Sequence, residues 1–185
     1  IPGLHSTGRR DILAHMFFDT HAHFDLLVDP AAPDGGIPAL LQRAKDAGVA
    51  RILAIGGSPA ANQKALALAR QYPAQIRAAA ALDRSQSPTP AALSELEGLL
   101  AAPEIGAMGE TGLDYFHGRR DDPAPRNLFR RMLEMARAHV LPVIVHSRDA
   151  DREILEDLTA HAAGWTGAPD GIGVLHCFTG GPDYA

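Results

Sequence analysis

The chain has 185 residues, of which 46% are hydrophobic and 21% charged, a balance that is typical of a folded globular domain and excludes a disordered chain. Its net charge of -5 argues against a protein that coats nucleic acid by electrostatic attraction alone, but it leaves open a nuclease whose bound cations supply the positive charge. No apolar run approaches the roughly 20 residues that span a bilayer, and the single cysteine, Cys177, cannot form an internal disulfide. We therefore expect a cytoplasmic protein without membrane contacts.

Short apolar runs alternate along the chain with longer segments of helical periodicity. Strands are predicted at 16–19, 51–55, 76–82, 105–108, 142–145 and 173–175, and helices at 37–47, 59–71, 90–101, 124–139 and 149–162. This alternation predicts an α/β fold with a parallel sheet and right-handed crossovers. Both a doubly wound open sheet and a (β/α)8 barrel fit the periodicity. We favour the (β/α)8 TIM barrel because polar residues follow several strands, at the rim where such barrels carry their active sites.

The two ends of the chain shape the expected domain organisation. Residues 1–15 precede Met16 and the first predicted strand, and we interpret them as an N-terminal extension or a remnant of cloning. About six strand–helix units are visible, whereas a barrel of this type needs eight. Residues 16–185 are therefore expected to form an incomplete barrel that is truncated after about six units.

The first motif with chemical content is "DTHAHFD" at the end of the first strand. Side chains alternate along a strand, so His21 and His23 face the same way, which in a barrel is the interior. Two imidazoles this close would repel each other if both were protonated, and a divalent cation avoids this by binding their neutral nitrogens. A pair of structural or surface histidines is the alternative.

The second motif is "AMGETGLDY", in which Glu110 follows the strand 105–108 and Asp114 lies in the next loop. A buried, unpaired carboxylate is costly, so a metal that binds both oxygens would explain Glu110. The alternative is that Glu110 pairs with an arginine and Asp114 caps the next turn.

Two further histidines end predicted strands. His146 ends "LPVIVH", with Arg148 at the beginning of the following loop, and His176 ends "GVLH". A single histidine in such a place is more often structural than a ligand. Here the placement recurs on several strands, and the C-terminal ends of parallel barrel strands meet at one rim. We therefore expect one metal site formed by His21, His23, Glu110, His146 and His176.

Four segments, "FFDTHAHFD", "AMGETGLDYF", "PVIVHSRDA" and "GVLHCFTGG", resemble in order and spacing the signature segments of the TatD family of metal-dependent deoxyribonucleases. The resemblance extends from about Met16 to Gly181. It implies a TIM barrel of the amidohydrolase type with two divalent cations, either Mg²⁺, Mn²⁺ or Zn²⁺. One cation would be held by His21, His23 and Glu110, and the second by Glu110, His146 and His176.

The resemblance also implies that DNA phosphodiester bonds are hydrolysed by a metal-activated water, with Glu110 as the catalytic ligand. Asp114 and Arg148 are expected to bind substrate, because a planar guanidinium matches phosphate oxygens; a salt bridge between Arg148 and Asp149 is an equal alternative. The expected partner is DNA, attacked from its 3′ or its 5′ end by a monomeric protein. A basic cluster after the fourth strand either follows the nucleic-acid backbone or forms a solvated helix face: Arg119, Arg120, Arg126, Arg130 and Arg131.

The chain departs from the family pattern in two places. The family usually carries a G-x-H-P segment after the third strand, whereas this chain has "AAAALDRSQSP", which weakens the expected substrate contacts of that loop. The essential aspartate on the eighth strand of the family lies outside the chain. The chain as given is therefore expected to be inactive.

Two other functions remain open. A related barrel could hydrolyse an amide, a lactone or a phosphotriester, but many such sites bridge their metals with a modified lysine. Here Lys45 and Lys64 both lie in predicted helices, and Glu110 takes the bridging place. A catalytically inactive scaffold is the second alternative, against which the set of converging ligands argues.

Overall fold

The computed structural model describes residues 16–24, 36–118, 120–178 and 180–181, and the expected N-terminal extension, 1–15, lies outside the described residues. One parallel sheet contains the strands β1 (Phe17–Ala22), β2 (Val49–Gly57), β3 (Ile76–Leu82), β4 (Ile105–Asp114), β5 (Val143–Arg148) and β6 (Gly173–His176). The strands follow one another in chain order. A doubly wound sheet would reverse its order at a switch point, so the sequential order confirms the predicted barrel class.

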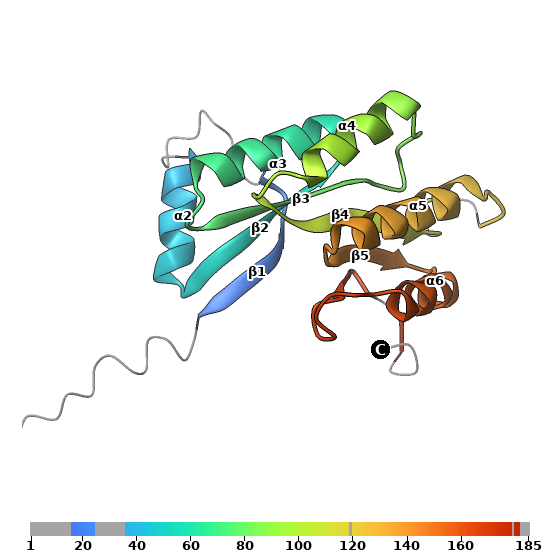
Figure 1. Cartoon of the computed structure of the whole chain (residues 1–185). Helices are drawn as coiled ribbons and strands as arrows, with labels where there is room; N and C mark the ends of the chain where they lie inside the picture. The colour runs from blue at the N-terminus through green and yellow to red at the C-terminus, as the bar shows by residue number, and fades with distance from the viewer. Residues whose placement is uncertain (1–15, 25–35, 119, 179, 182–185) are drawn as a thin grey trace, which may run out of the picture.

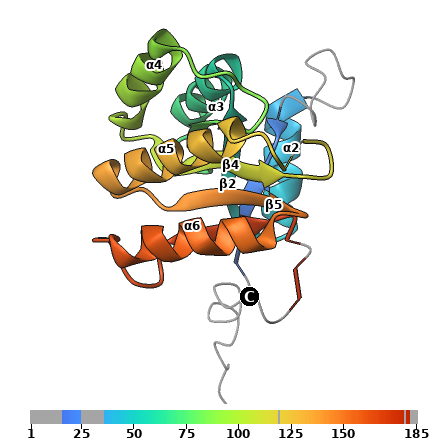
Figure 2. The same cartoon turned by 90° about the vertical axis from the view of Figure 1, so that its right-hand side faces the viewer.

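Within the described residues, five helices alternate with the strands: α2 (Gly36–Asp46), α3 (Pro59–Gln71), α4 (Pro90–Leu100), α5 (Ala124–His139) and α6 (Asp151–Ala163). Figures 1 and 2 show that these helices follow the outside of the curved sheet. Two of them begin at a proline, where the missing N–H costs nothing. The preceding residues, Ser58 and Thr89, cap the helices by accepting hydrogen bonds from the backbone N–H groups two residues after the prolines. These local signals explain why both boundaries were predictable.

Buried apolar side chains on the two faces of the sheet belong to two separate hydrophobic clusters. The larger cluster fills the space between strands and helices, where Phe129 and Met132 of α5 are fully buried. Truncation of such an aromatic core residue costs about 3–5 kcal/mol. A smaller cluster, which includes Leu53 and Ile144, lies on the opposite, inner face of the sheet. Because side chains alternate along a strand, His146, two residues after Ile144, also faces inward.

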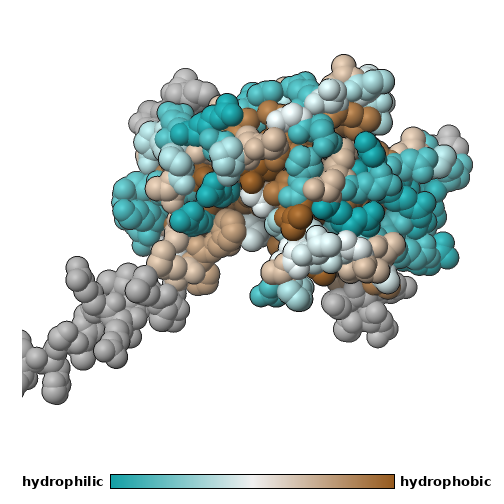
Figure 3. All heavy atoms as spheres, in the orientation of Figure 1, coloured by the Kyte–Doolittle hydropathy of each residue, from teal (hydrophilic) through white to brown (hydrophobic). Residues whose placement is uncertain are grey.

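Apolar side chains are exposed on both edge strands of the sheet: Met16, Phe17 and Phe18 at β1, and Val174 and Leu175 on β6. Figure 3 shows the apolar side chains at β1 next to the more hydrophilic residues of α2. None of the described helices is long and apolar enough to cross a membrane.

Strands β4 and β5 extend past the residues predicted for them, and both extensions carry candidate site residues. Glu110 and Asp114 lie within β4, not after it, and Arg148 is the last residue of β5, not the start of a loop. Pairing between β4 and β5 continues to Asp114 and Arg148, with a register shift between Gly109 and Thr111. The helix predicted from residue 149 begins at Asp151, because the backbone of Asp149 is left-handed (φ 55°).

Candidate metal centre

Three donor atoms form a small triangle at the end of β1. The Nε2 atoms of His21 and His23 lie 3.0 Å apart, and each lies 3.3 Å from Oε2 of Glu110 on β4. The strand period brings the two imidazoles together, and the parallel arrangement of the sheet brings Glu110 to the same rim. The expected grouping of these three side chains is thus present in the structure.

The triangle fits a divalent cation. Metal bonds of about 2.0–2.2 Å to nitrogen and oxygen place neighbouring ligand atoms roughly 3.0–3.5 Å apart, which is the spacing of these three atoms. In addition, Nδ1 of His21 is buried without a hydrogen-bond partner among the described residues. Buried polar atoms without partners are uncommon and require an explanation. Imidazole and carboxylate donors suit Zn²⁺ and Mn²⁺, and carboxylate also suits Mg²⁺.

His146 lies between two carboxylates. Its Nδ1 is 2.8 Å from Oε1 of Glu110, and its Nε2 is 3.2 Å from Oδ2 of Asp114. Glu110 therefore presents one oxygen to the two β1 histidines and the other to His146. A carboxylate on the second nitrogen fixes the orientation and tautomer of a ligand histidine, and Asp114 can have this effect on His146.

His176 completes the group from β6. Its ring stacks on that of His21 with 3.5 Å between centroids, and its centroid lies 6.2 Å from that of His146. Donor atoms of His21, Glu110 and His176 all lie within 4.8 Å of one another, as do those of His146, His176 and Cys177. Cys177 was not predicted as a ligand, but its Sγ is 3.2 Å from Nε2 of His176. Its position directly after a candidate ligand was the available signal.

The pKa values of two members of the group, Glu110 and His176, are shifted in the directions that favour cation binding. Burial alone would raise the pKa of Glu110, but contacts with the His146 and His21 imidazoles outweigh it and hold this pKa well below its ordinary value. Burial, together with the neighbouring His21, lowers the pKa of His176. An ionised carboxylate and a neutral imidazole are the forms that bind metals.

Asp114 is buried at the end of β4 and contacts several neighbouring groups at once. Its Oδ1 accepts hydrogen bonds from the backbone N–H groups of Phe116 and His117, and its Oδ2 lies 3.0 Å from Nδ1 of His117. Burial would raise the pKa of Asp114, but the His117 hydrogen bonds and the charge of Arg84 lower it to about 2. Arg84, from the loop after β3, was not anticipated; the only signal was its place in the segment that departs from the family pattern.

The remaining predicted residues are arginines: Arg148 at the end of β5, and the basic cluster that follows β4. The Arg148 guanidinium is stacked 3.9 Å over the ring of Phe116, an arrangement that neither sequence interpretation foresaw. Most of the basic cluster pairs with carboxylates: Arg120 with Glu153, Arg126 and Arg130 with Asp157, and Arg131 with Glu134. These pairs agree with the solvated helix face, and Arg119 lies outside the described residues.

The parallel barrel sheet and the histidines and carboxylates clustered at its strand ends indicate the class of protein: a barrel protein with a candidate metal centre. The chain belongs to the family of TatD-related DNases, whose model matches residues 18–185. This membership confirms the resemblance that the four sequence motifs carry.

Relatives and solved structures agree with this membership. The chain is 34% identical over 168 residues to an uncharacterized metal-dependent hydrolase, TatD, of Mycobacterium tuberculosis, and the match covers 87% of this chain and 60% of that protein. It is 32% identical over 143 residues to a 3′-5′ ssDNA/RNA exonuclease, TatD, of Erwinia billingiae, with coverage of 76% and 53%. The crystal structure of YjjV, a TatD homologue from Escherichia coli, superposes with a TM-score of 0.76 at 31% identity and covers 91% of this chain and 62% of that one. The chain therefore spans between 53% and 62% of the length of these relatives.

Proposed function

We propose that the protein is a metal-dependent hydrolase that cleaves phosphodiester bonds of single-stranded DNA, and that residues 16–185 belong to the barrel domain that carries its active site. The observation behind this proposal is the convergence of donors from β1, β4, β5 and β6 at one point. The Erwinia billingiae relative, which is named as an exonuclease of single-stranded DNA and RNA, supports the choice of substrate.

In this proposal His21, His23 and Glu110 hold one divalent cation, and Glu110, His146 and His176 hold a second. The bound cations would supply a water of lowered pKa and polarise a phosphoryl oxygen. Glu110 is suited to bridge them, because its two oxygens face different histidines.

The other residues of the chain prepare the site. Asp114 holds the ring of His146 in one orientation from its far nitrogen. Glu110 and His146 are both largely shielded from solvent, with side chains 10% and 8% exposed. This shielding strengthens electrostatic interactions with a bound phosphodiester, since the local dielectric constant is low.

The proposal is tested with the protein at its full gene-encoded length. After dialysis against Mn²⁺, bound metal is measured by inductively coupled plasma mass spectrometry, and cleavage of a 5′-labelled single-stranded oligonucleotide is followed on gels. We expect bound divalent cations and shortened oligonucleotide. His21→Ala should lose cations and reduce kcat/KM at least about 100-fold, the usual cost of an essential electrostatic contact.

His139→Ala is the matched control, because His139 lies on α5 and pairs with Glu97 away from the site. It should keep both the metal and the activity. Parallel assays with a dipeptide and a lactone address the related barrel hydrolases. Turnover of either small substrate with untouched DNA would overturn the nuclease assignment, and absence of bound cations after incubation with excess Mn²⁺ would favour an inactive scaffold.

A further inference from the structure

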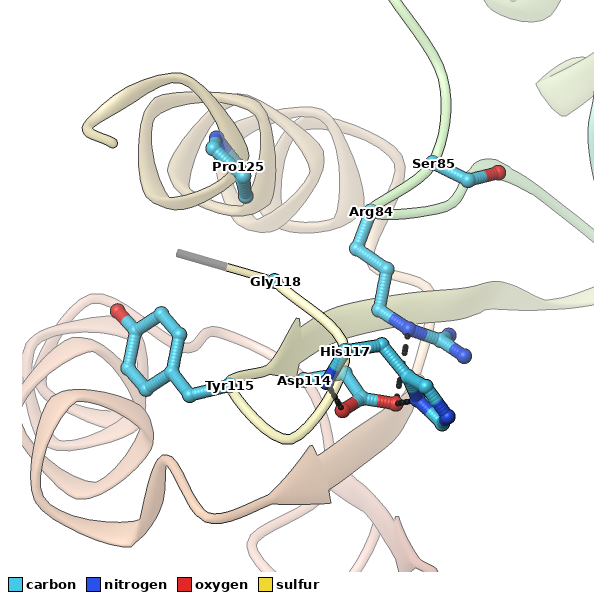
Figure 4. Close-up of a pocket in the computed structure, with 7 residues that line it drawn as sticks. All are labelled: Arg84, Ser85, Asp114, Tyr115, His117, Gly118 and Pro125. Atoms are coloured by element: carbon cyan, nitrogen blue, oxygen red, sulfur yellow. Dashed lines mark hydrogen bonds and ion pairs between the residues drawn. The ribbon is translucent and has the colours of Figure 1, made fainter. Parts of the chain in front are cut away.

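A pocket of about 350 Å³ borders the candidate metal centre (Figure 4). Its lining comes from the loop after β3, from the end of β4 and the loop after it, and from the start of α5: Arg84, Ser85, Asp114, Tyr115, His117, Gly118 and Pro125. The volume is within the range of small-molecule sites. Asp114 belongs to both places, because it lines the pocket and lies 3.2 Å from His146. A molecule bound at the metal centre would therefore have the pocket directly beside it.

Arg84 is the cation of this pocket. In Figure 4 its side chain extends from the loop after β3 toward Asp114. Its Nε lies 3.5 Å from Oδ2 of Asp114, and one Nη lies 3.8 Å from Oε1 of Glu110. Both separations exceed the usual N–H···O distance of about 2.7–3.2 Å. The two carboxylates therefore attract the guanidinium electrostatically, but its five N–H donors do not form close hydrogen bonds with them.

Asp114 does not depend on Arg84 for its hydrogen bonds. Two backbone N–H groups and the His117 ring already contact its oxygens at 3.0–3.1 Å. Its side chain is only 2% exposed, whereas that of Arg84 is 31% exposed. A purely structural ion pair would be expected to close to hydrogen-bond distance, as Arg126 and Asp157 do at 2.8 Å. The carboxylate therefore aims the guanidinium and leaves its donors accessible.

We propose that Arg84 binds a phosphate group of the substrate in this pocket, with Asp114 as its positioning residue, and thereby selects phosphoesters over neutral amides and lactones. The inference rests on the proposed function and deepens it. A guanidinium fork matches two phosphate oxygens, and such charge-assisted pairs are among the strong hydrogen bonds of proteins. Cations bound at Glu110 would also weaken the hold of this carboxylate on Arg84 and leave the fork free for phosphate.

The test compares Arg84→Gln, Arg84→Lys and the control Arg131→Gln in the full-length protein. Arg131 is an exposed arginine of α5 that pairs only with its own helix neighbour Glu134 among the described residues. Binding of a fluorescein-labelled single-stranded DNA is measured by anisotropy with Ca²⁺ over a series of KCl concentrations. Each phosphate contact contributes about 0.7 to the slope of log affinity against log salt for single strands.

Arg84→Gln should bind about 10- to 100-fold more weakly, as expected for loss of a charged hydrogen bond, and its salt slope should fall by about 0.7. Arg84→Lys should keep the slope, because it keeps the charge, but should recover only part of the affinity, because it lacks the fork. Arg131→Gln should match the wild type in both. In turnover assays the loss in Arg84→Gln should be a raised KM.

An unchanged affinity and salt slope in Arg84→Gln would overturn the role of Arg84 even if the wild type cleaves DNA. A wild type that neither binds nor cleaves DNA would instead overturn the proposed function, and this inference with it. If Arg84→Gln fails to fold, as judged by circular dichroism, the test relies on Arg84→Lys. An affinity and a KM of Arg84→Lys equal to those of the wild type would refute the need for the guanidinium fork.

Discussion

The imidazole rings of His21 and His176 stack with 3.5 Å between centroids and within 4° of parallel, although the two residues come from the first and the last strand of the sheet. The sheet therefore curves far enough for its edge strands to bring side chains into contact. Two protonated rings would repel each other in this arrangement, and the pKa of His176 is lowered by burial and by His21. The stack consequently favours a neutral His176 imidazole, which is able to bind a cation.

Divalent cations are expected to stabilise the folded protein through this group. Binding only to the folded state at 100 times the dissociation constant adds about 2.7 kcal/mol to the free energy of unfolding. Scanning calorimetry of EDTA-treated protein with and without Mn²⁺ should therefore show a rise in Tm. The rise should be strongly reduced in His176→Ala and retained in His139→Ala. An equal rise in both variants would place the cation elsewhere.

Gly112 sets the distance between β4 and β5 at the site. Its φ is +139°, and a Cβ on it would lie 2.1 Å from the carbonyl oxygen of His146. Gly112→Ala should therefore displace the His146 backbone, lower the free energy of unfolding by about 1–3 kcal/mol and weaken metal binding. Gly98 on α4 is the control, because its Cβ would meet nothing within 4 Å.

Urea unfolding of both variants is the measurement. Gly98→Ala should gain about 0.5–1 kcal/mol, since alanine loses less backbone entropy in a helix. Stability of Gly112→Ala at or above that of the wild type would mean that the strands separate at no cost.

The sequence carries enough local information for the strand–helix order. Apolar runs, helical periods and the capped prolines at Pro59 and Pro90 are properties of neighbouring residues, and parallel topology then brings strand ends together without further detail. This is why His146 and His176 could be assigned to the same rim as His21. Whether they bind cations stays a prediction, since their roles depend on an ion as well as on position.

The contacts that loops make at the site could not be predicted from the sequence. Arg84 approaches Glu110 and Asp114 from a segment without periodicity, and no local pattern indicates which loop covers the rim. The extent of β4 was missed for a related reason. Glycines around Glu110 are typical of a loop, but hydrogen bonding to β5, which is distant in sequence, keeps the segment extended.

His161 should make the stability of the protein sensitive to acid. It is fully buried on α6, and burial, followed by the charge of Arg137, lowers its pKa below the ordinary value of 6.5. Below pH 6.5 the unfolded chain takes up a proton that the folded protein resists, so acid favours unfolding. The contribution of neutral His161 is therefore complete above pH 6.5 and is lost as the pH falls toward the lower, folded-state pKa.

His161→Gln removes this titration. The difference in unfolding free energy between wild type and variant should shrink by up to about 1.4 kcal/mol per pH unit below 6.5. Urea unfolding at pH 7.5 and 5.5, in EDTA to exclude metal effects, measures it. A difference that does not change with pH would show that His161 takes up its proton as readily in the folded protein.

Asp157 should contribute more to stability than a surface ion pair does. Its side chain is 5% exposed and lies 2.8 Å both from Nε of Arg126 and from Nε of Arg130, so it joins α6 to α5. Asp157→Asn leaves two guanidinium groups without this charge, and breaking a buried pair costs about 3–5 kcal/mol. We expect the free energy of unfolding to fall by about 2–3 kcal/mol in Asp157→Asn, because Arg130 is half exposed and water can replace part of the contact.

Glu156→Gln is the control, since Glu156 pairs with Arg126 at the surface, and it should lower the free energy of unfolding by less than about 1 kcal/mol. Equal losses in the two variants on urea unfolding would show that burial of Asp157 adds nothing to the pair.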